Sequence, residues 1–117
     1  MTVTPLTGAD DKARTLFELW PAHDWAGIFA TFAPRMAAAF PEAEIPNAWA
    51  QIIAQVGELE TIADDAYVRV HDIHTVVDVP LEFEAGEMVG RVTFDESGHV
   101  AGLFFLNPDA ASESESQ

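Results

Sequence analysis

The sequence contains no cysteine and few basic residues. Its 117 residues include 5 Lys and Arg against 20 Asp and Glu, which gives a formal net charge of -15. The absence of cysteine excludes disulfide bonds, thiolate zinc ligands and thiol nucleophiles. A strongly negative field repels the phosphates of nucleic acids and anionic lipid surfaces. We therefore expect neither nucleic acid nor a membrane as a partner.

The sequence also lacks a long apolar run and a basic, apolar start. No stretch approaches the roughly 20 apolar residues that a membrane-spanning helix needs, and the first residues do not resemble a signal peptide. Apolar residues nevertheless make up 49% of the chain, which is typical of a globular protein. These features favour a cytoplasmic protein with one domain over residues 10–107. We expect residues 1–9 to form a flexible arm and residues 108–117 an acidic disordered tail.

Three apolar stripes with helical spacing lie in the first half of the chain. Each repeats apolar side chains at i, i+3, i+4 and i+7, which places them on one helical face. The stripes predict helices that begin near Asp10, near His23 and at Pro46, and the second is followed by a short helical piece from Pro34 to Phe40. The stripe residues are Ala13, Leu16, Phe17 and Trp20, then Trp25, Ile28, Phe29 and Phe32, then Trp49, Ile52, Ile53 and Val56.

After Gly57 the apolar period changes from 3.6 to 2, which indicates strands. Four strands are predicted over residues 59–70, 73–84, 87–95 and 99–106, with a bend in the first near residue 63. Helices followed by consecutive strands are typical of an α+β domain. The expected fold is therefore three N-terminal helices packed on a curved four-stranded antiparallel sheet.

The alternation predicts which strand residues face the helices. Turns at residues 85–86 and 96–98 align apolar residues across the strands, whereas a one-residue slip at the first turn would bury Glu82 and Asp78. Two glycines on this inner face leave room for a bend or a pocket. The expected inner face contains Val77, Val79, Leu81, Phe83, Met88, Gly90, Val92, Phe94, Val100, Gly102, Phe104 and Leu106.

The opposite, outer face of the predicted sheet combines charges with an apolar strip. Glu82 and Arg91 are expected to form a surface ion pair. Val89, Leu103 and Phe105 are expected to form the strip, and a contiguous apolar patch is typical of an interface. We therefore expect a homodimer through this face.

Histidine–acid pairs are the candidates for chemistry. His23 is either a general base oriented by Asp24 or Asp78, or it begins a helix that Asp24 caps. His71 and His74 lie close in sequence but lack enough converging ligands for a metal site, so we expect no metal and no cofactor. The tryptophans either fill the core or stack on a ligand. A small-molecule pocket is expected to be lined by Trp20, Trp25, Phe29, Trp49, Tyr67, Val79, Phe83, Gly90, Val92, Gly102 and Phe104.

Two segments resemble the DUF3887 family. One is the final hairpin, VTFDESGHVAGLFF over residues 92–105, and the other is Gly57-Glu58-Leu59 after the tryptophan-bearing helix. The resemblance covers roughly residues 10–107 and is most specific in the hairpin. It implies an NTF2-like (cystatin-like), cone-shaped α+β fold. The family has no established general activity, and its domains often accompany hydrolase domains, so the resemblance assigns no catalytic residue.

Two classes of function follow from these expectations. The apolar inner face favours a non-catalytic module whose cone binds a hydrophobic small molecule, or a dimeric accessory or scaffold domain. The alternative is a small acid–base enzyme, an isomerase, cyclase or dehydratase that acts on an aromatic or polyketide-like substrate through His23 and a nearby acid. A histidine within hydrogen-bond reach of a carboxylate in the cavity would favour the enzyme.

Overall fold

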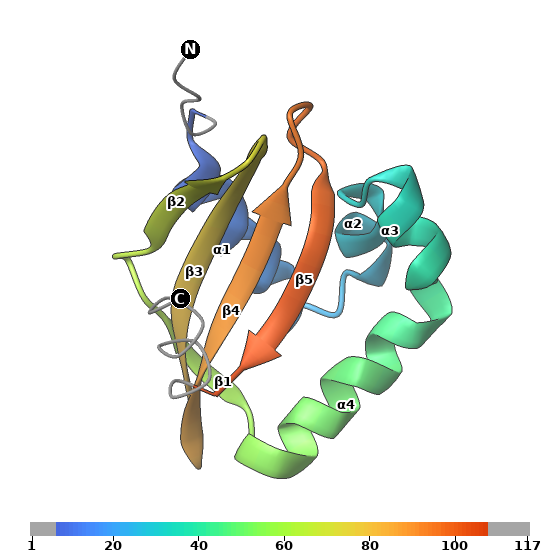
Figure 1. The fold of residues 1–117 in the computed structure, drawn as a ribbon. Helices are drawn as coiled ribbons and strands as arrows, with labels where there is room; N and C mark the ends of the chain where they lie inside the picture. The colour runs from blue at the N-terminus through green and yellow to red at the C-terminus, as the bar shows by residue number, and fades with distance from the viewer. Residues whose placement is uncertain (1–6, 108–117) are drawn as a thin grey trace.

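A computed structural model describes residues 7–107, with all helices before all strands (Figure 1). The predicted α+β fold, with helices packed on an open antiparallel sheet, is confirmed. The expected acidic tail, 108–117, and most of the expected arm lie outside the described residues. Among the described residues, no helix is both long enough and apolar enough to cross a membrane.

Four α-helices and one short 3-10 helix precede the sheet. They are α1 (Ala9–Leu19), α2 (Trp25–Ala30), α3 (Pro34–Ala39), η1 (Glu42–Glu44) and α4 (Ile45–Val56). In Figure 1, α1 crosses behind the sheet, and α4 runs from α3 back to the first strand. Buried residues of α1, α2 and α4 form one core cluster with the inner side of the sheet.

Local interactions set the starts of α2 and α3 and the end of α4. The Asp24 side chain accepts a hydrogen bond from the Gly27 amide at 3.0 Å, so the expected cap of α2 is confirmed. Pro34 starts α3, where its missing N–H costs nothing. Gly57 ends α4 with a φ of 80°, a backbone conformation that favours glycine.

The sheet contains five antiparallel strands. They are β1 (Leu59–Ile62), β2 (Tyr67–His71), β3 (His74–Phe83), β4 (Gly86–Phe94) and β5 (Val100–Leu106), and both β1 and β2 pair with β3. The prediction of four strands is wrong because its first strand is two strands in the structure. The residues between them include Asp64 and Asp65, a residue type disfavoured in strands.

The β3–β4 turn occupies residues 84–85, so Phe83 pairs with Gly86 and Leu81 with Met88. The predicted turn at residues 85–86 is therefore wrong by one position, and the pairing is shifted by two residues. A shift of two keeps every side chain on its predicted face, because strand side chains alternate with a period of two. The side chains of Val77, Val79, Leu81 and Phe83 in β3 accordingly face the helices, as predicted.

A β-bulge interrupts the pairing of β4 with β5. Phe94 pairs with Val100 as predicted, but the next pair is Thr93 with Gly102. Ala101 is therefore an extra residue in β5. One inserted residue moves all later side chains of the strand to the opposite face.

The bulge overturns the predicted faces of five residues. Leu106 was expected on the inner face, but it pairs with Val89 of the outer face. Leu103 and Phe105 were expected on the outer strip, but both pack against the core cluster. Phe104 was expected on the inner face, but it follows the bulge, points outward and is 54% exposed. Gly102 likewise moves to the outer face, where its nearest neighbours are side-chain atoms of Phe104 and Thr93.

The expected space above Gly90 is filled by a side chain. A Cβ atom at Gly90 would lie 2.3 Å from Cζ of Phe17, so the α1 ring occupies the room that the glycine leaves. The neighbouring Trp20 is 1% exposed, and its indole Nε1 has no hydrogen-bond partner among the described residues. The inner face at this point is core rather than an open cone.

Candidate functional site

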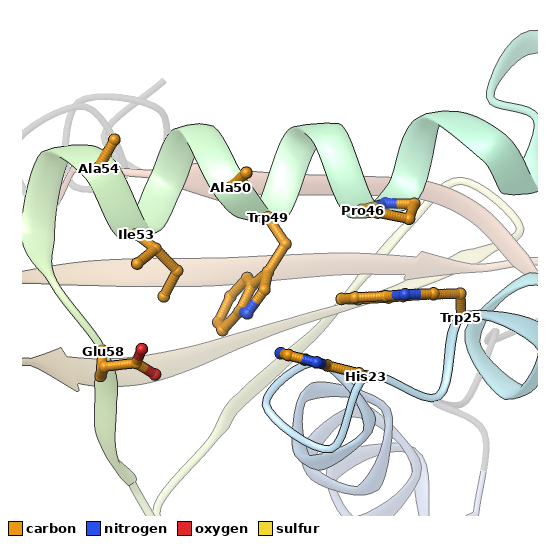
Figure 2. Close-up of a pocket in the computed structure, with 8 residues that line it drawn as sticks. All are labelled: His23, Trp25, Pro46, Trp49, Ala50, Ile53, Ala54 and Glu58. Carbon is orange, nitrogen blue, oxygen red and sulfur yellow. The ribbon is translucent and has the colours of Figure 1, made fainter.

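A groove of about 420 Å³ lies between α4 and the segment that links α1 to α2 (Figure 2). We call it the α4 groove. It is lined by His23, Trp25, Pro46, Trp49, Ala50, Ile53, Ala54 and Glu58.

One wall of the α4 groove is a single face of α4. Pro46, Trp49 and Ala50, then Ile53 and Ala54, are spaced three or four residues apart and therefore share that face. Trp49 is the best anchored of them, because it is 4% exposed and its ring packs about 6.0 Å from two core phenylalanine rings. The wall is thus built on the rigid core.

The opposite wall is aromatic. The ring of His23 stacks on Trp25 with a centroid distance of 5.0 Å and an interplanar angle of 17°, and both lie below α4 in Figure 2. Trp25 in turn meets the buried Trp20 edge-on at 6.3 Å. His23 has a φ of 60°, an uncommon conformation for a residue other than glycine. The sharp turn after α1 therefore brings two rings to the groove.

Glu58 closes one end of the α4 groove and is held by Glu84. The Glu58 amide donates to Oε1 of Glu84 at 2.8 Å, and the Glu84 amide donates to the Glu58 carbonyl at 3.0 Å. Gly57 allows this close approach, since a Cβ there would lie 2.8 Å from Cβ of Glu84. Figure 2 shows the Glu58 side chain extending toward the groove.

The expected His23–Asp24 pair is not assembled as a catalytic dyad. Asp24 does not line the groove, and its carboxylate caps α2 through Gly27. Among the described residues, no hydrogen bond or ion pair joins His23 to a carboxylate. Of the two interpretations left open by the sequence, the structure supports the one in which Asp24 is a helix cap.

The structure gathers a small part of the predicted pocket residues. Trp25 and Trp49 line the α4 groove, and His23 from the candidate pair joins them. The others do not line it: Trp20, Val79, Phe83 and Val92 are buried in the core, Phe29 packs against the core, Gly90 lies under Phe17, and Tyr67, Gly102 and Phe104 lie on the outer face.

The sequence did not identify Glu58 or the alanines of α4 as site residues. Ala50 and Ala54 each follow a residue of the apolar stripe, Trp49 or Ile53. Their position beside the stripe was the one signal that could have indicated them. Glu58 carries no local signal, because its place depends on the distant Glu84.

A second feature is an ion cluster on the outer face of the sheet. Arg91 donates to Asp78 through Nε at 2.7 Å and Nη2 at 2.9 Å, and Arg69 donates through Nη1 at 3.0 Å. We call these three residues the Asp78 cluster. The predicted pairing of Arg91 with Glu82 is wrong, since Arg91 lies opposite Asp78 in the register.

The arginines control the ionisation of Asp78. Burial by itself raises the pKa of the Asp78 carboxyl, but hydrogen bonds from Arg91 and Arg69, together with their charges, outweigh it. The pKa of Asp78 is therefore held below its ordinary value of 3.8. The carboxylate stays charged although its side chain is only 7% exposed.

Within residues 7–107, no group of three or more His, Cys, Asp or Glu side chains is placed to hold a metal ion.

The fold and the groove define a small α+β domain with an aromatic-lined groove beside its last helix. The family described as "Protein of unknown function (DUF3887)" matches residues 13–103, so the chain belongs to that family. The predicted family is thus confirmed, while the NTF2-like assignment stays a prediction. Comparison with curated proteins and with solved structures finds no match.

Proposed function

We propose that this protein is a non-catalytic binding module that holds a small hydrophobic molecule in the α4 groove. The observation that carries the proposal is a pair of tryptophans, Trp25 and Trp49, on facing walls of one groove. The volume of about 420 Å³ falls within the range typical of small-molecule pockets. Aromatic side chains supply large apolar contact areas, so two of them can hold a small ligand.

The packing behind the groove supports binding by a preformed site. Trp49 rests on Phe83 and Phe105, and Trp25 rests on Trp20. Side chains fixed before binding lose little conformational entropy when a ligand arrives, which raises affinity. Binding without catalysis is favoured over the acid–base enzyme, because the neighbouring Asp24 is used as a helix cap and no carboxylate within residues 7–107 bonds to the candidate base His23.

A blocking variant tests this proposal. Ala50 is exposed and lines the groove, so Ala50→Phe should fill it, whereas Gln51→Phe adds the same ring to an exposed position on α4 outside the groove. Titration with neutral N-phenyl-1-naphthylamine should give saturable fluorescence for the wild type and Gln51→Phe, and none for Ala50→Phe. No saturable binding by the wild type, or equal binding by both variants, would overturn the proposal.

The outer face of the sheet supports a second candidate function, self-association. Tyr67 and Phe104 are 57% and 54% exposed and belong to one cross-strand row, with Asp78 and Arg91 between them. Exposed aromatic residues and arginine are enriched in interfaces. The Asp78 cluster contains two arginines and one carboxylate, so its net positive charge lowers the repulsion between two acidic molecules at this face. We propose a homodimer through this face. Its interface contains Val89 and Phe104, and Phe104 replaces the predicted Leu103 and Phe105.

Light scattering during gel filtration tests the dimer. The wild type should elute with twice its monomer mass, and Phe104→Ser should elute as a monomer. Ile73→Ser is the matched control, because Ile73 is 52% exposed but lies between β2 and β3, away from this row. A monomeric wild type at about 100 µM, a concentration well above the Kd of a stable dimer, would rule the proposal out.

A further inference from the structure

We infer that the α4 groove selects organic cations, that is, molecules that join an apolar body to a protonated amine. The inference rests on the proposed function, since it names the class of ligand for the same groove.

The charged residues around the groove are acidic. Glu58 lines its end, and the Glu84 carboxylate binds the Glu58 amide, which places a second negative charge beside the first. None of the lining residues, all in the described part of the chain, is Lys or Arg. An anionic ligand would therefore meet repulsion at this end, and a cation would meet attraction.

Four of the five basic residues are engaged elsewhere, and the fifth, Arg35 on α3, does not line the groove. Lys12 contacts the Gly98 carbonyl, and Arg14 pairs with Asp11. The other two arginines with assigned partners belong to the Asp78 cluster on the outer face of the sheet. The acidic end of the groove therefore has no nearby guanidinium among these residues to neutralise it.

The aromatic walls add a second attraction for cations. The face of an indole ring is electrostatically negative, and a cation within about 6 Å of it is stabilised, more so for tryptophan than for other rings. Trp25 and Trp49 line the same groove as Glu58. A net charge of -15 also raises the concentration of cations around the whole molecule. These three effects act in the same direction.

Three probes with one apolar body separate the effect of charge from that of shape. They are 4-phenylbutylamine, which is cationic at pH 7, neutral 4-phenyl-1-butanol and anionic 4-phenylbutyrate. Binding is measured at low salt from the indole ¹⁵N–¹H resonances of the protein, which has three tryptophans. The amine should bind about three- to fivefold more tightly than the alcohol, and the butyrate more weakly than either. The largest shifts should belong to Trp25 and Trp49.

A matched pair of variants assigns the charge effect to the groove. Glu58→Gln and Glu60→Gln each remove one exposed carboxylate, but Glu60 does not line the groove. Glu58→Gln should lower the preference for the amine over the alcohol about three- to fivefold, whereas Glu60→Gln should leave that preference unchanged.

The outcomes separate this inference from the proposed function. If amine and alcohol bind the wild type equally, the cation inference fails and the binding function stands. If Glu60→Gln weakens amine binding as much as Glu58→Gln, selection by the groove is overturned. If none of the three probes shifts the resonances of Trp25 and Trp49, both proposals fail.

Discussion

Asp78 is a buried carboxylate whose charge is compensated by two arginines on neighbouring strands. Removing one member of such a group leaves the charges of the others uncompensated in a partly desolvated position. The resulting loss of folding stability is larger than the net contribution of the ion pair itself. The Asp78 cluster joins β2, β3 and β4 through side chains alone. It therefore supports the outer face of the sheet, where no helix packs in Figure 1.

We predict that Asp78→Asn lowers the free energy of unfolding by about 3 kcal/mol at pH 7. The folded-state pKa of Asp78 lies below its unfolded value of 3.8. The Asp78 carboxylate therefore binds a proton more tightly in the unfolded chain than in the folded one. The contribution of Asp78 is complete above that value and is lost as pH falls through the folded-state pKa. The difference between wild type and variant, measured by urea unfolding, should therefore narrow below about pH 4.

Asp65→Asn is the control for this titration, since Asp65 is exposed. It should change stability by less than about 0.5 kcal/mol at every pH. A gap between wild type and Asp78→Asn that stays constant down to pH 2 would show that ionisation of Asp78 does not stabilise the fold.

Substitution by alanine should destabilise the protein at Gly90 but have little effect at Gly102. At Gly90 a Cβ atom would clash with the ring of Phe17, at 2.3 Å from Cζ, in the packed core. At Gly102 the nearest atom would lie at 3.5 Å, an ordinary contact. Gly90→Ala should lower the free energy of unfolding by about 1–3 kcal/mol, and Gly102→Ala should change it by less than about 0.5 kcal/mol. Equal effects in thermal unfolding would contradict the assignment of the two faces.

At the scale of one element, the bulge in β5 decides which phenylalanine stabilises the protein. Phe105 packs against the rings of Phe17, Trp20 and Trp49 at centroid distances of 5.2–6.0 Å. Phe105→Ala should therefore cost about 2–3 kcal/mol in denaturant unfolding, because it leaves a cavity among those rings. At a protein concentration low enough to keep both chains monomeric, Phe104→Ala removes a ring that is 54% exposed and should cost less than about 1 kcal/mol. The reverse order would mean that β5 pairs without the bulge.

The helices could be predicted from the sequence because their signals are local. The stripe that contains Trp49 predicted α4, and Asp24 followed by an apolar run predicted the start of α2. The bulge could not be predicted, because Ala101 has no distinctive chemistry. The backbone of Val100 also bonds to Thr31 and Ala33, at 2.8 Å each, far away in sequence.

The candidate site divides in the same way. The aromatic residues Trp25 and Trp49 could be chosen as ligand contacts, because tryptophan places a large apolar ring on a predicted stripe. The rings that line the groove could not be told from the rings that fill the core, because both occur at the same helical spacing in the sequence. Glu58 was missed because its position depends on hydrogen bonds with Glu84, 26 residues away.

At the scale of the whole molecule, the net charge of -15 opposes folding through self-repulsion. The described residues extend over 45 × 30 × 22 Å. At about 10 mM salt the Debye length is ~30 Å, so carboxylates repel one another across most of the molecule; at about 150 mM it is ~8 Å, and only neighbours interact. Raising NaCl between these limits should therefore raise Tm by about 5 °C.

Calorimetry at pH 7 measures this shift, with KCl at matched ionic strength as the control for specific binding of Na⁺. The buried Asp78 cluster is screened less than exposed charges, so the salt should not offset the gain by weakening it. Most of the rise should occur below about 150 mM, where the Debye length shrinks past the width of the molecule. A Tm that stays flat over this range would mean that counter-charges within the fold already balance the repulsion. A steady rise that continues at molar salt would instead point to preferential exclusion of the salt from the protein surface.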